Sequence, residues 1–193
     1  MTEIILASKS PRRRELLGGL FKSFRIETRE VEESLDPDIH PRRGVELLAV
    51  RKGQGVSEAY PEALVISSDT LVELDGVPLG KPCDGDDARR MLRSLSGRTH
   101  NVHTGVAVHY RGHVFSGVDT TGVSFRELTD EEIGDYLASG EPMDKAGAYG
   151  IQGLGGKFVL GINGAFDTVV GLSMKLTASL VNQALGGKFN EEK

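Results

Sequence analysis

Apolar residues recur along this chain with two spacings, and each spacing predicts a different secondary structure. In the first half, short apolar runs alternate with segments whose apolar residues recur at helical spacing. From Val102 to Tyr110 the apolar residues recur at every second position, and after a turn at Arg111-Gly112 the pattern returns through Val114 to Phe125. This second pattern predicts a long antiparallel hairpin.

The order of elements predicts a mixed α/β sheet, because helices alternate with strands in the first half and meandering strands dominate the second. The expected strands are 3–7, 23–29, 63–68 and 157–163, besides the long hairpin and a short one across Asp75-Gly76. The expected helices are 11–20, 42–59, 84–95, 130–139 and 171–185. Thr129 and Glu132 predict a capping box at the start of the fourth helix. The glycine-rich residues 147–156 predict a loop.

Composition narrows the class of protein. The 193 residues suit a single domain over 1–193, and 38% apolar with 26% charged residues is typical of a globular fold. A net charge of −5 argues against a broad nucleic-acid surface. Cys83 is the only cysteine, so no intrachain disulfide forms. The chain shows neither a signal-peptide pattern nor an apolar run of roughly 20 residues, so we expect a cytoplasmic protein without membrane contact.

Hydroxyl and guanidinium groups gather where the first strand gives way to the first helix. Pro11 suits the first helical position and Ser10 the N-cap, so Arg12 and Arg13 fall on the first turn. Backbone N–H groups there, with a dipole equivalent to roughly half a positive charge, favour an anion. Arginine adds bidentate donors. Together with Ser8, these residues predict a phosphate site; an ordinary capped helix with solvated arginines is the alternative.

Carboxylates follow two of the predicted strands. Asp69-Thr70 comes directly after the apolar strand 63–68, and α/β sheets place ligands at the carboxyl ends of strands. A carboxylate there binds Mg²⁺, activates water, or both; a turn-forming aspartate is the alternative. Glu32-Glu33 follows the second strand, and adjacent residues on an extended strand point to opposite sides, so only one of them faces a site.

Two lysines and one glutamine are further candidates for substrate contacts. Lys81 stands between glycine and proline, a stiff frame that suits a charge aimed at phosphate, whereas Lys52 within helix 42–59 has no such local argument. Gln152 offers the donor and acceptor needed to read a base edge, or it ties down its own loop. His100 and His103 lack the companion ligands that zinc requires, which argues against zinc there.

Taken together, the motifs of the chain resemble those of the Maf family of nucleoside triphosphate pyrophosphatases, once described as septum-formation inhibitors. The resemblance covers nearly the whole length and rests on many short motifs in one order. These are Ala7-Ser8-Lys9-Ser10-Pro11-Arg12-Arg13, Glu33, Lys52, Ser68-Asp69-Thr70, Gly80-Lys81-Pro82, Gly97-Arg98-Thr99-His100, Val102-His103-Thr104-Gly105 and Ala146-Gly147-Ala148-Tyr149-Gly150-Ile151-Gln152-Gly153.

The resemblance implies a fold similar to that of inosine triphosphate pyrophosphatases: an α/β structure with a long twisted mixed sheet, flanking helices and two lobes around a cleft. The Ala-Tyr-Gly-Ile-Gln-Gly form of the last motif resembles the branch that acts on dTTP and UTP, rather than the branch preferring 7-methyl-GTP. The family resemblance further implies that Asp69 accepts a proton and that Arg12, Thr70 and Gln152 determine substrate choice.

We therefore expect hydrolysis of the α–β phosphoanhydride of dTTP and UTP, and of modified pyrimidine analogues, to the monophosphate and pyrophosphate. Asp69 is the expected catalytic residue and, with Glu33, the expected ligand of a divalent metal, Mg²⁺ before Mn²⁺. The expected substrate-binding residues are Ser8, Ser10, Arg12, Arg13, Lys52, Thr70, Lys81 and Gln152.

Two other functions stay open from the sequence: a nucleotide-binding regulator of cell division without essential catalysis, and a phosphatase that releases orthophosphate. The apolar face of helix 171–185 suits a homodimer as easily as the core.

Overall fold

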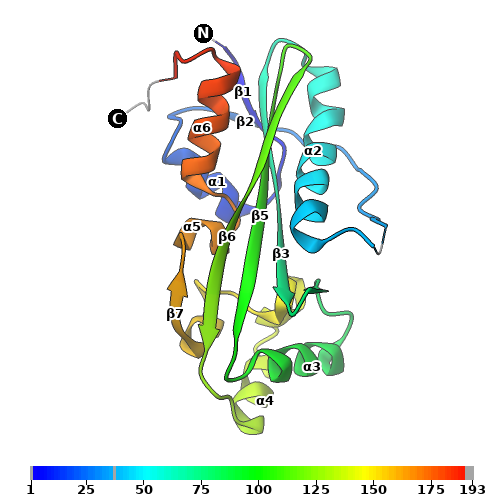
Figure 1. Cartoon of the computed structure of the whole chain (residues 1–193), viewed down its shortest axis with the longest axis vertical. Coiled ribbons are helices and arrows are strands. Elements are labelled where there is room, and N and C mark those ends of the chain that lie inside the picture. Colours follow the sequence, from blue (N-terminus) through cyan, green and yellow to red (C-terminus); the bar gives the residue numbers. More distant parts are fainter. Residues whose placement is uncertain (1, 37, 190–193) are drawn as a thin grey trace. The chain divides into compact units, whose positions relative to one another are not determined.

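A mixed sheet of seven strands organises residues 2–36 and 38–189, which the computed structural model describes (Figure 1). The strand order is β2-β1-β3-β5-β6-β7, and β4 pairs with β3. The strands are β1 (Ile4–Leu6), β2 (Arg25–Ile26), β3 (Leu64–Leu74), β4 (Val77–Leu79), β5 (Thr99–Tyr110), β6 (His113–Phe125) and β7 (Val159–Asn163). Because β1 runs parallel to β2 and β3 while β3–β4 and β6–β7 are antiparallel, the predicted mixed α/β sheet is confirmed.

Helices and short 3₁₀ turns connect these strands. The α-helices are α1 (Pro11–Gly18), α2 (Pro41–Ala59), α3 (Gly85–Leu95), α4 (Asp130–Ala138), α5 (Phe166–Val170) and α6 (Met174–Ala184). The 3₁₀ turns are η1 (Glu141–Asp144), η2 (Ala146–Ala148) and η3 (Leu154–Phe158). Within the described ranges no helix combines the length and apolar character that a bilayer span requires.

The chain divides into two compact units. The first consists of the chain up to Asp69, Thr104–Asp119 and the chain from Gly171. The second consists of Thr70–His103 and Thr120–Val170. The residues of the site predicted from sequence are therefore divided between the two units.

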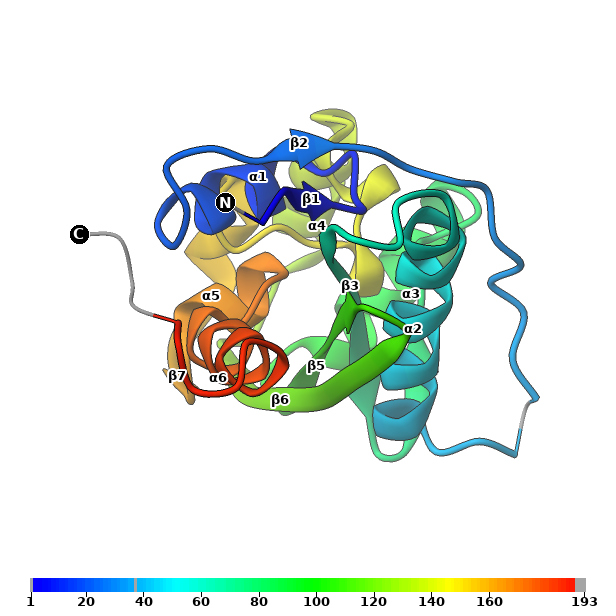
Figure 2. The ribbon, with the colours of Figure 1, turned by 90° about the horizontal axis from the view of Figure 1, so that it is seen from above.

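In the first unit, helices cover both faces of the strands. Leu64 and Ile66 of β3 face a cluster with Leu17 of α1 and Leu180 of α6, whereas Val65 between them packs with Val56 of α2. Alternate side chains of a strand point to opposite faces, which is why one apolar run serves two layers. Viewed from above, α2 and α6 lie on opposite sides of β3 and β5 (Figure 2).

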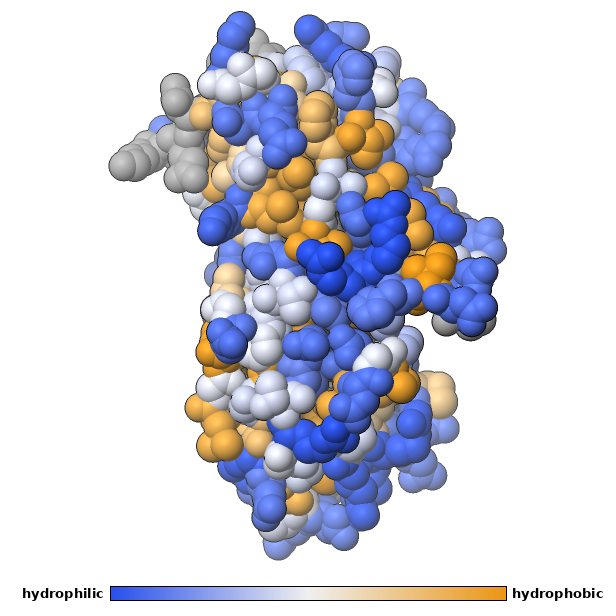
Figure 3. All heavy atoms as spheres, viewed as in Figure 1, coloured by the Kyte–Doolittle hydropathy of each residue, from blue (hydrophilic) through white to orange (hydrophobic). Residues whose placement is uncertain are grey.

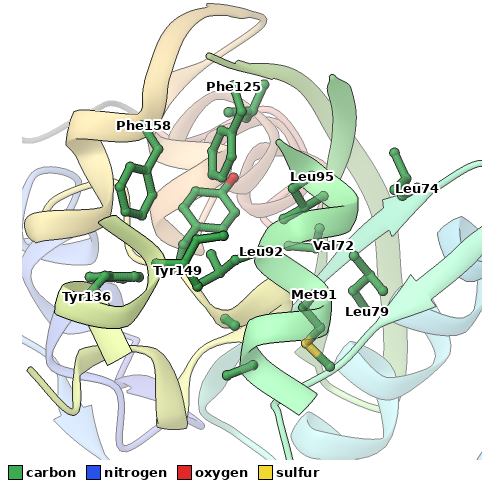
Figure 4. Packing of buried hydrophobic residues seen from close by; sticks show 14 of the residues in the cluster. Val72, Leu74, Leu79, Met91, Leu92, Leu95, Phe125, Tyr136, Tyr149 and Phe158 are labelled. Carbon is green, nitrogen blue, oxygen red and sulfur yellow. The ribbon is translucent and has the colours of Figure 1, made fainter. Parts of the chain in front are cut away.

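The second unit has its own apolar core, shown in Figure 4. Leu92 of α3 is fully buried there, and the rings of Phe125 and Tyr149 meet edge to face with centroids 4.8 Å apart. Edge-to-face contacts of this kind add about 0.5–1.5 kcal/mol each beyond area burial. Figure 3 shows hydrophilic residues over much of the drawn face, with hydrophobic patches among them.

Several local predictions are confirmed. Arg111 and Gly112 turn the long hairpin with positive φ values of 49° and 77°, the combination that a type I′ turn requires. The capping box between Thr129 and Glu132 is present at the start of α4. The glycine-rich residues after Ala146 form only 3₁₀ turns and irregular chain, as expected for a loop.

Several boundaries differ from the sequence prediction, and the strand expected over 23–29 is only the two-residue β2. The strand expected to end at Ser68 continues as β3 to Leu74, so Asp69 lies inside a strand and not at its tip. The reason is a change of neighbours, because β3 pairs with β1 only as far as Ile66 and then continues beside β5 and β4. The last helix begins at Met174 after the N-cap Ser173, and the short α5 precedes it.

Helix α2 approaches the sheet so closely that glycine is required at two positions. A Cβ at Gly53 would lie 2.5 Å from the His109 ring and 2.6 Å from Ser67 Oγ. A Cβ at Gly105 of β5 would lie 2.5 Å from the carbonyl oxygen of Val45. These distances are shorter than van der Waals contact, so α2 can lie this close to the strands only because Gly53 and Gly105 have no side chain.

We predict opposite effects for two glycine substitutions in α2. Gly53→Ala should lower the free energy of unfolding by about 1–3 kcal/mol through overpacking, despite the better helix propensity of alanine. Gly55→Ala should raise it by about 0.5–1 kcal/mol, because its Cβ would only touch Arg29 at 3.4 Å. Urea denaturation of both variants measures the difference. Equal shifts in the same direction would contradict the close-packing account.

Candidate active site

The start of α1 is built as the sequence predicted. Pro11 occupies the first turn, and the Ser10 side chain accepts the Arg13 N–H at 3.4 Å as the N-cap. Ser8 Oγ accepts the Ser10 N–H at 3.2 Å. The first N–H groups of a helix lack intrahelical acceptors, so this end of α1 favours an anion.

Arg13 is held in place by a carbonyl group from a distant part of the chain. Its Nε donates to the Gly171 carbonyl at 2.9 Å, and the Ser68 hydroxyl donates to the same oxygen at 2.9 Å. Burial lowers the pKa of Arg13, and the negative charges of Asp69 and Glu33 oppose that shift. The guanidinium therefore acts in the same electrostatic environment as the two predicted carboxylates.

Asp69 and Glu33 converge on one cation. Lys52 Nζ of α2 lies 2.5 Å from Asp69 Oδ1 of β3 and 3.2 Å from Glu33 Oε1. The side chains of Lys52 and Asp69 are 20% and 14% exposed, whereas that of Glu33 is 61% exposed. The Lys52–Asp69 contact is thus partly removed from water and worth more than a surface ion pair, while the Glu33 contact is screened.

The donor atoms of this cluster fit a hard divalent cation. Carboxylate oxygens are the ligands that Mg²⁺ prefers, and Asp69 and Glu33 already surround a positive charge. No group of three or more His, Cys, Asp or Glu side chains suited to a metal occurs within residues 2–36 and 38–189. Two carboxylates completed by substrate phosphates and water are a common arrangement for Mg²⁺.

The first unit contains seven of the ten predicted site residues. These are Ser8, Ser10, Arg12, Arg13, Glu33, Lys52 and Asp69. Arg12 is half-buried on α1, and its charge lowers the pKa of Arg13. The sequence did not reveal Ser68 and Gly171 as the groups that fix Arg13. No local pattern could have found them, because the bonds span 103 and 158 residues.

Thr70, Lys81 and Gln152 belong to the second unit. Thr70 follows Asp69 on β3, so the two side chains point to opposite faces of the sheet. Lys81 is exposed after β4, and Gln152 is exposed between η2 and η3. The Gly147 N–H donates to the Gly80 carbonyl at 3.0 Å, so one backbone bond joins the segments that carry Lys81 and Gln152.

His100 and His103 have protein partners in the second unit. His100 Nε2 lies 2.8 Å from the Tyr149 hydroxyl inside the aromatic core. His103 Nε2 lies 2.9 Å from Glu73 Oε2, and its Nδ1 lies 2.8 Å from Thr120 Oγ1. These contacts occupy three of the four ring nitrogens.

Comparison with known proteins extends these observations. The model of the family described as Maf-like protein matches residues 3–184. A dTTP/UTP pyrophosphatase of Escherichia coli O6:K15:H31 (strain 536 / UPEC) is 48% identical over 183 residues, which are 94% of this chain and 93% of that protein. A nucleoside triphosphate pyrophosphatase of Shigella flexneri is 47% identical over the same shares. The solved structure of the Staphylococcus aureus Ham1 protein matches with a TM-score of 0.47 and 19% identity, covering 67% of this chain and 73% of that one.

We predict that His100 makes the protein less stable in acid. Burial lowers the pKa of His100 from 6.5 to about 4, so the unfolded chain binds a proton in this window and the folded chain does not. Stability is therefore unaffected by His100 above pH 6.5 and falls by about 3 kcal/mol as the pH drops to about 4. Urea denaturation at several pH values should show this loss, and His100→Phe should reduce it. An identical pH dependence in the variant would contradict the assignment.

Proposed function

The chain belongs to the Maf family, and on that premise we propose that it hydrolyses dTTP and UTP to the nucleoside monophosphate and pyrophosphate. Relatives at 48% identity over 94% of the chain carry the name dTTP/UTP pyrophosphatase. The observation that carries the proposal in the structure is the contact of Asp69 and Glu33 with Lys52, on the same unit as Arg13 and the start of α1. A general base and phosphate-binding cations are what this reaction needs.

Asp69 is the residue we assign to activation of the attacking water. Lys52 contacts its Oδ1, which fixes the carboxylate and leaves Oδ2 as the oxygen that accepts the proton of the water. The water oxygen then attacks the α-phosphorus, and the bond from this phosphorus to the bridging oxygen breaks. The electron pair of that bond leaves with pyrophosphate.

Positive charge on the first unit suits the leaving pyrophosphate. Arg12, Arg13 and Lys52 supply cations, and Ser8, Ser10 and the first amides of α1 supply further donors. Because phosphoryl transfer needs little covalent chemistry from the protein, placement of these groups accounts for most of the catalysis. Asp69 and Glu33 would hold a divalent metal, Mg²⁺ or Mn²⁺, which would add positive charge beside the phosphoryl oxygens.

The remaining assignments follow the family resemblance. Lys81 is assigned to the phosphates, and Thr70 and Gln152, with Arg12, to the choice of base. Leu180 and Val181 of α6 pack inside the first unit. This packing does not test the homodimer, which stays a prediction. The names of the relatives do not favour a regulator of cell division without catalysis.

One assay tests the proposed function. The purified chain is incubated with dTTP and Mg²⁺, and the phosphate products are separated. Release of pyrophosphate with dTMP supports the proposal. Orthophosphate as the first product would indicate a general phosphatase, and no product would leave only a nucleotide-binding role; either result overturns the proposal.

We predict that Asp69→Asn keeps the fold and lowers kcat for dTTP by at least ~100-fold, since a missing general base costs about 10²–10⁴. Asp75→Asn is the matched control, because Asp75 lies just after β3 and its ion pair with Arg98 is exposed. Steady-state pyrophosphate release measures kcat, and urea denaturation checks the fold. A wild-type kcat in Asp69→Asn would remove Asp69 from the mechanism.

We also predict that Gln152→Ala lowers the preference for dTTP over dCTP by roughly 10-fold in kcat/KM, because a site that hydrogen-bonds its substrate discriminates through that bond. Lys157→Ala, an exposed change in the following 3₁₀ turn, should leave the preference unaltered. Competition between the two nucleotides measures the ratio. The same ratio in wild type and Gln152→Ala would exclude Gln152 from base recognition.

A further inference from the structure

The glycines around Gln152 make room for a carboxylate from another segment. A Cβ at Gly153 would lie 2.5 Å from Glu141 Oε2, and a Cβ at Gly155 would lie 2.7 Å from the Tyr136 hydroxyl. Gly153 has φ −101°, a value that any residue adopts. The absence of a side chain at Gly153 is therefore needed for the close approach of Glu141 and not for the backbone conformation.

The Glu141 carboxylate bonds to the turn that follows Gln152. Its Oε2 accepts the Leu154 N–H at 2.9 Å, and its Oε1 accepts the Gly155 N–H at 3.2 Å. The Tyr136 hydroxyl donates to Oε1 at 2.9 Å and accepts the Gly150 N–H at 3.2 Å. Three donors thus converge on one charged group, which is a strong arrangement for fixing a loop.

The protonation state of Glu141 suits this role. Burial raises its pKa, but the bonds from the Leu154 and Gly155 amides, together with Tyr136, outweigh burial and lower the pKa below 4.5. The carboxylate therefore stays ionised at neutral pH, and both oxygens remain acceptors.

The chain before Gln152 is fixed as well. Tyr149 is buried in the aromatic core against Phe125 (Figure 4), and its hydroxyl lies 2.8 Å from His100 Nε2. Gln152 lies between this anchor and the Glu141 bonds, and it is itself exposed. A short segment held at both ends has a restricted backbone, which reduces the entropy lost when its exposed side chain binds a ligand.

We propose that Glu141 is a positioning residue for substrate recognition: by accepting the Leu154 and Gly155 amides it fixes the turn that presents Gln152 to the nucleobase. This inference rests on the proposed function, in which Gln152 reads the base. Glu141 itself is assigned no contact with the substrate.

The first test is Glu141→Gln, which keeps the shape of the side chain but replaces one acceptor oxygen with an NH₂ group that cannot accept an amide N–H. KM for dTTP should rise about tenfold while kcat changes less than about threefold, and the preference for dTTP over dCTP should fall about tenfold. A merely structural role predicts a lower fraction of active enzyme with KM and preference unchanged.

Glu132→Gln is the matched control. Glu132 also accepts a backbone N–H in the second unit, from Thr129, and it pairs with Arg126 at 2.7 Å. The substitution should lower stability without changing KM or the preference between bases. If Glu132→Gln shifts both by as much as Glu141→Gln, the positioning role of Glu141 is overturned.

Gly153→Ala is an independent variant, because the added methyl group would push the Glu141 carboxylate away from the turn although Glu141 itself is not mutated. It should show the same rise in KM and the same loss of preference. Amide hydrogen exchange should accelerate by about tenfold or more at one of Leu154 and Gly155 in Glu141→Gln, which keeps a single acceptor oxygen, and at both in Gly153→Ala, since these amides lose their acceptor. Unchanged exchange in Glu141→Gln would overturn the proposal.

The outcomes separate this inference from the proposed function. If the wild type releases no pyrophosphate from dTTP, the proposed function fails and the role of Glu141 fails with it. If the wild type is active while Glu141→Gln and Gly153→Ala keep its KM and base preference, only the Glu141 assignment fails.

Discussion

The close approach of α2 to β3 and β5 is the constraint on which the first unit depends. Gly53 and Gly105 leave no side chain between helix and strands, so Lys52, one residue before Gly53, reaches Asp69 at 2.5 Å. A bulkier residue at either position would separate the two layers and with them the ammonium and the carboxylate. The packing of α2 and the Lys52–Asp69 ion pair thus depend on the same close approach.

Charge placement follows from this packing. Lys52 and Asp69 are shielded enough for their attraction to be stronger than in water, yet exposed enough to meet a ligand. Arg13 is half-buried, loss of hydration lowers its pKa, and the Gly171 carbonyl orients its guanidinium. Pairing of these cations with carboxylates avoids unpaired buried charge, and in the proposed reaction the phosphates of the substrate would replace the carboxylates as partners of the cations.

The sequence predicts the parts of this structure that local rules determine. Three of these parts depend only on residues a few positions apart in the sequence. They are the N-cap Ser10, the turn at Arg111-Gly112 and the capping box at Thr129. The extension of β3 past Asp69 depends on which strand lies beside it. The bonds from Arg13 to Gly171, and from Glu141 to Leu154 and Gly155, join segments whose meeting only the tertiary fold decides. The order of the motifs predicts the candidate residues, whereas the groups that these residues contact follow only from the tertiary fold.

The central claim is that water activated at Asp69 attacks the α-phosphorus of a nucleoside triphosphate. Hydrolysis of dTTP in ¹⁸O-labelled water, followed by mass spectrometry of both products, tests it most directly. The account predicts one labelled oxygen in dTMP and none in pyrophosphate. Label in pyrophosphate, or in free orthophosphate, would place the attack on another phosphorus and contradict the account.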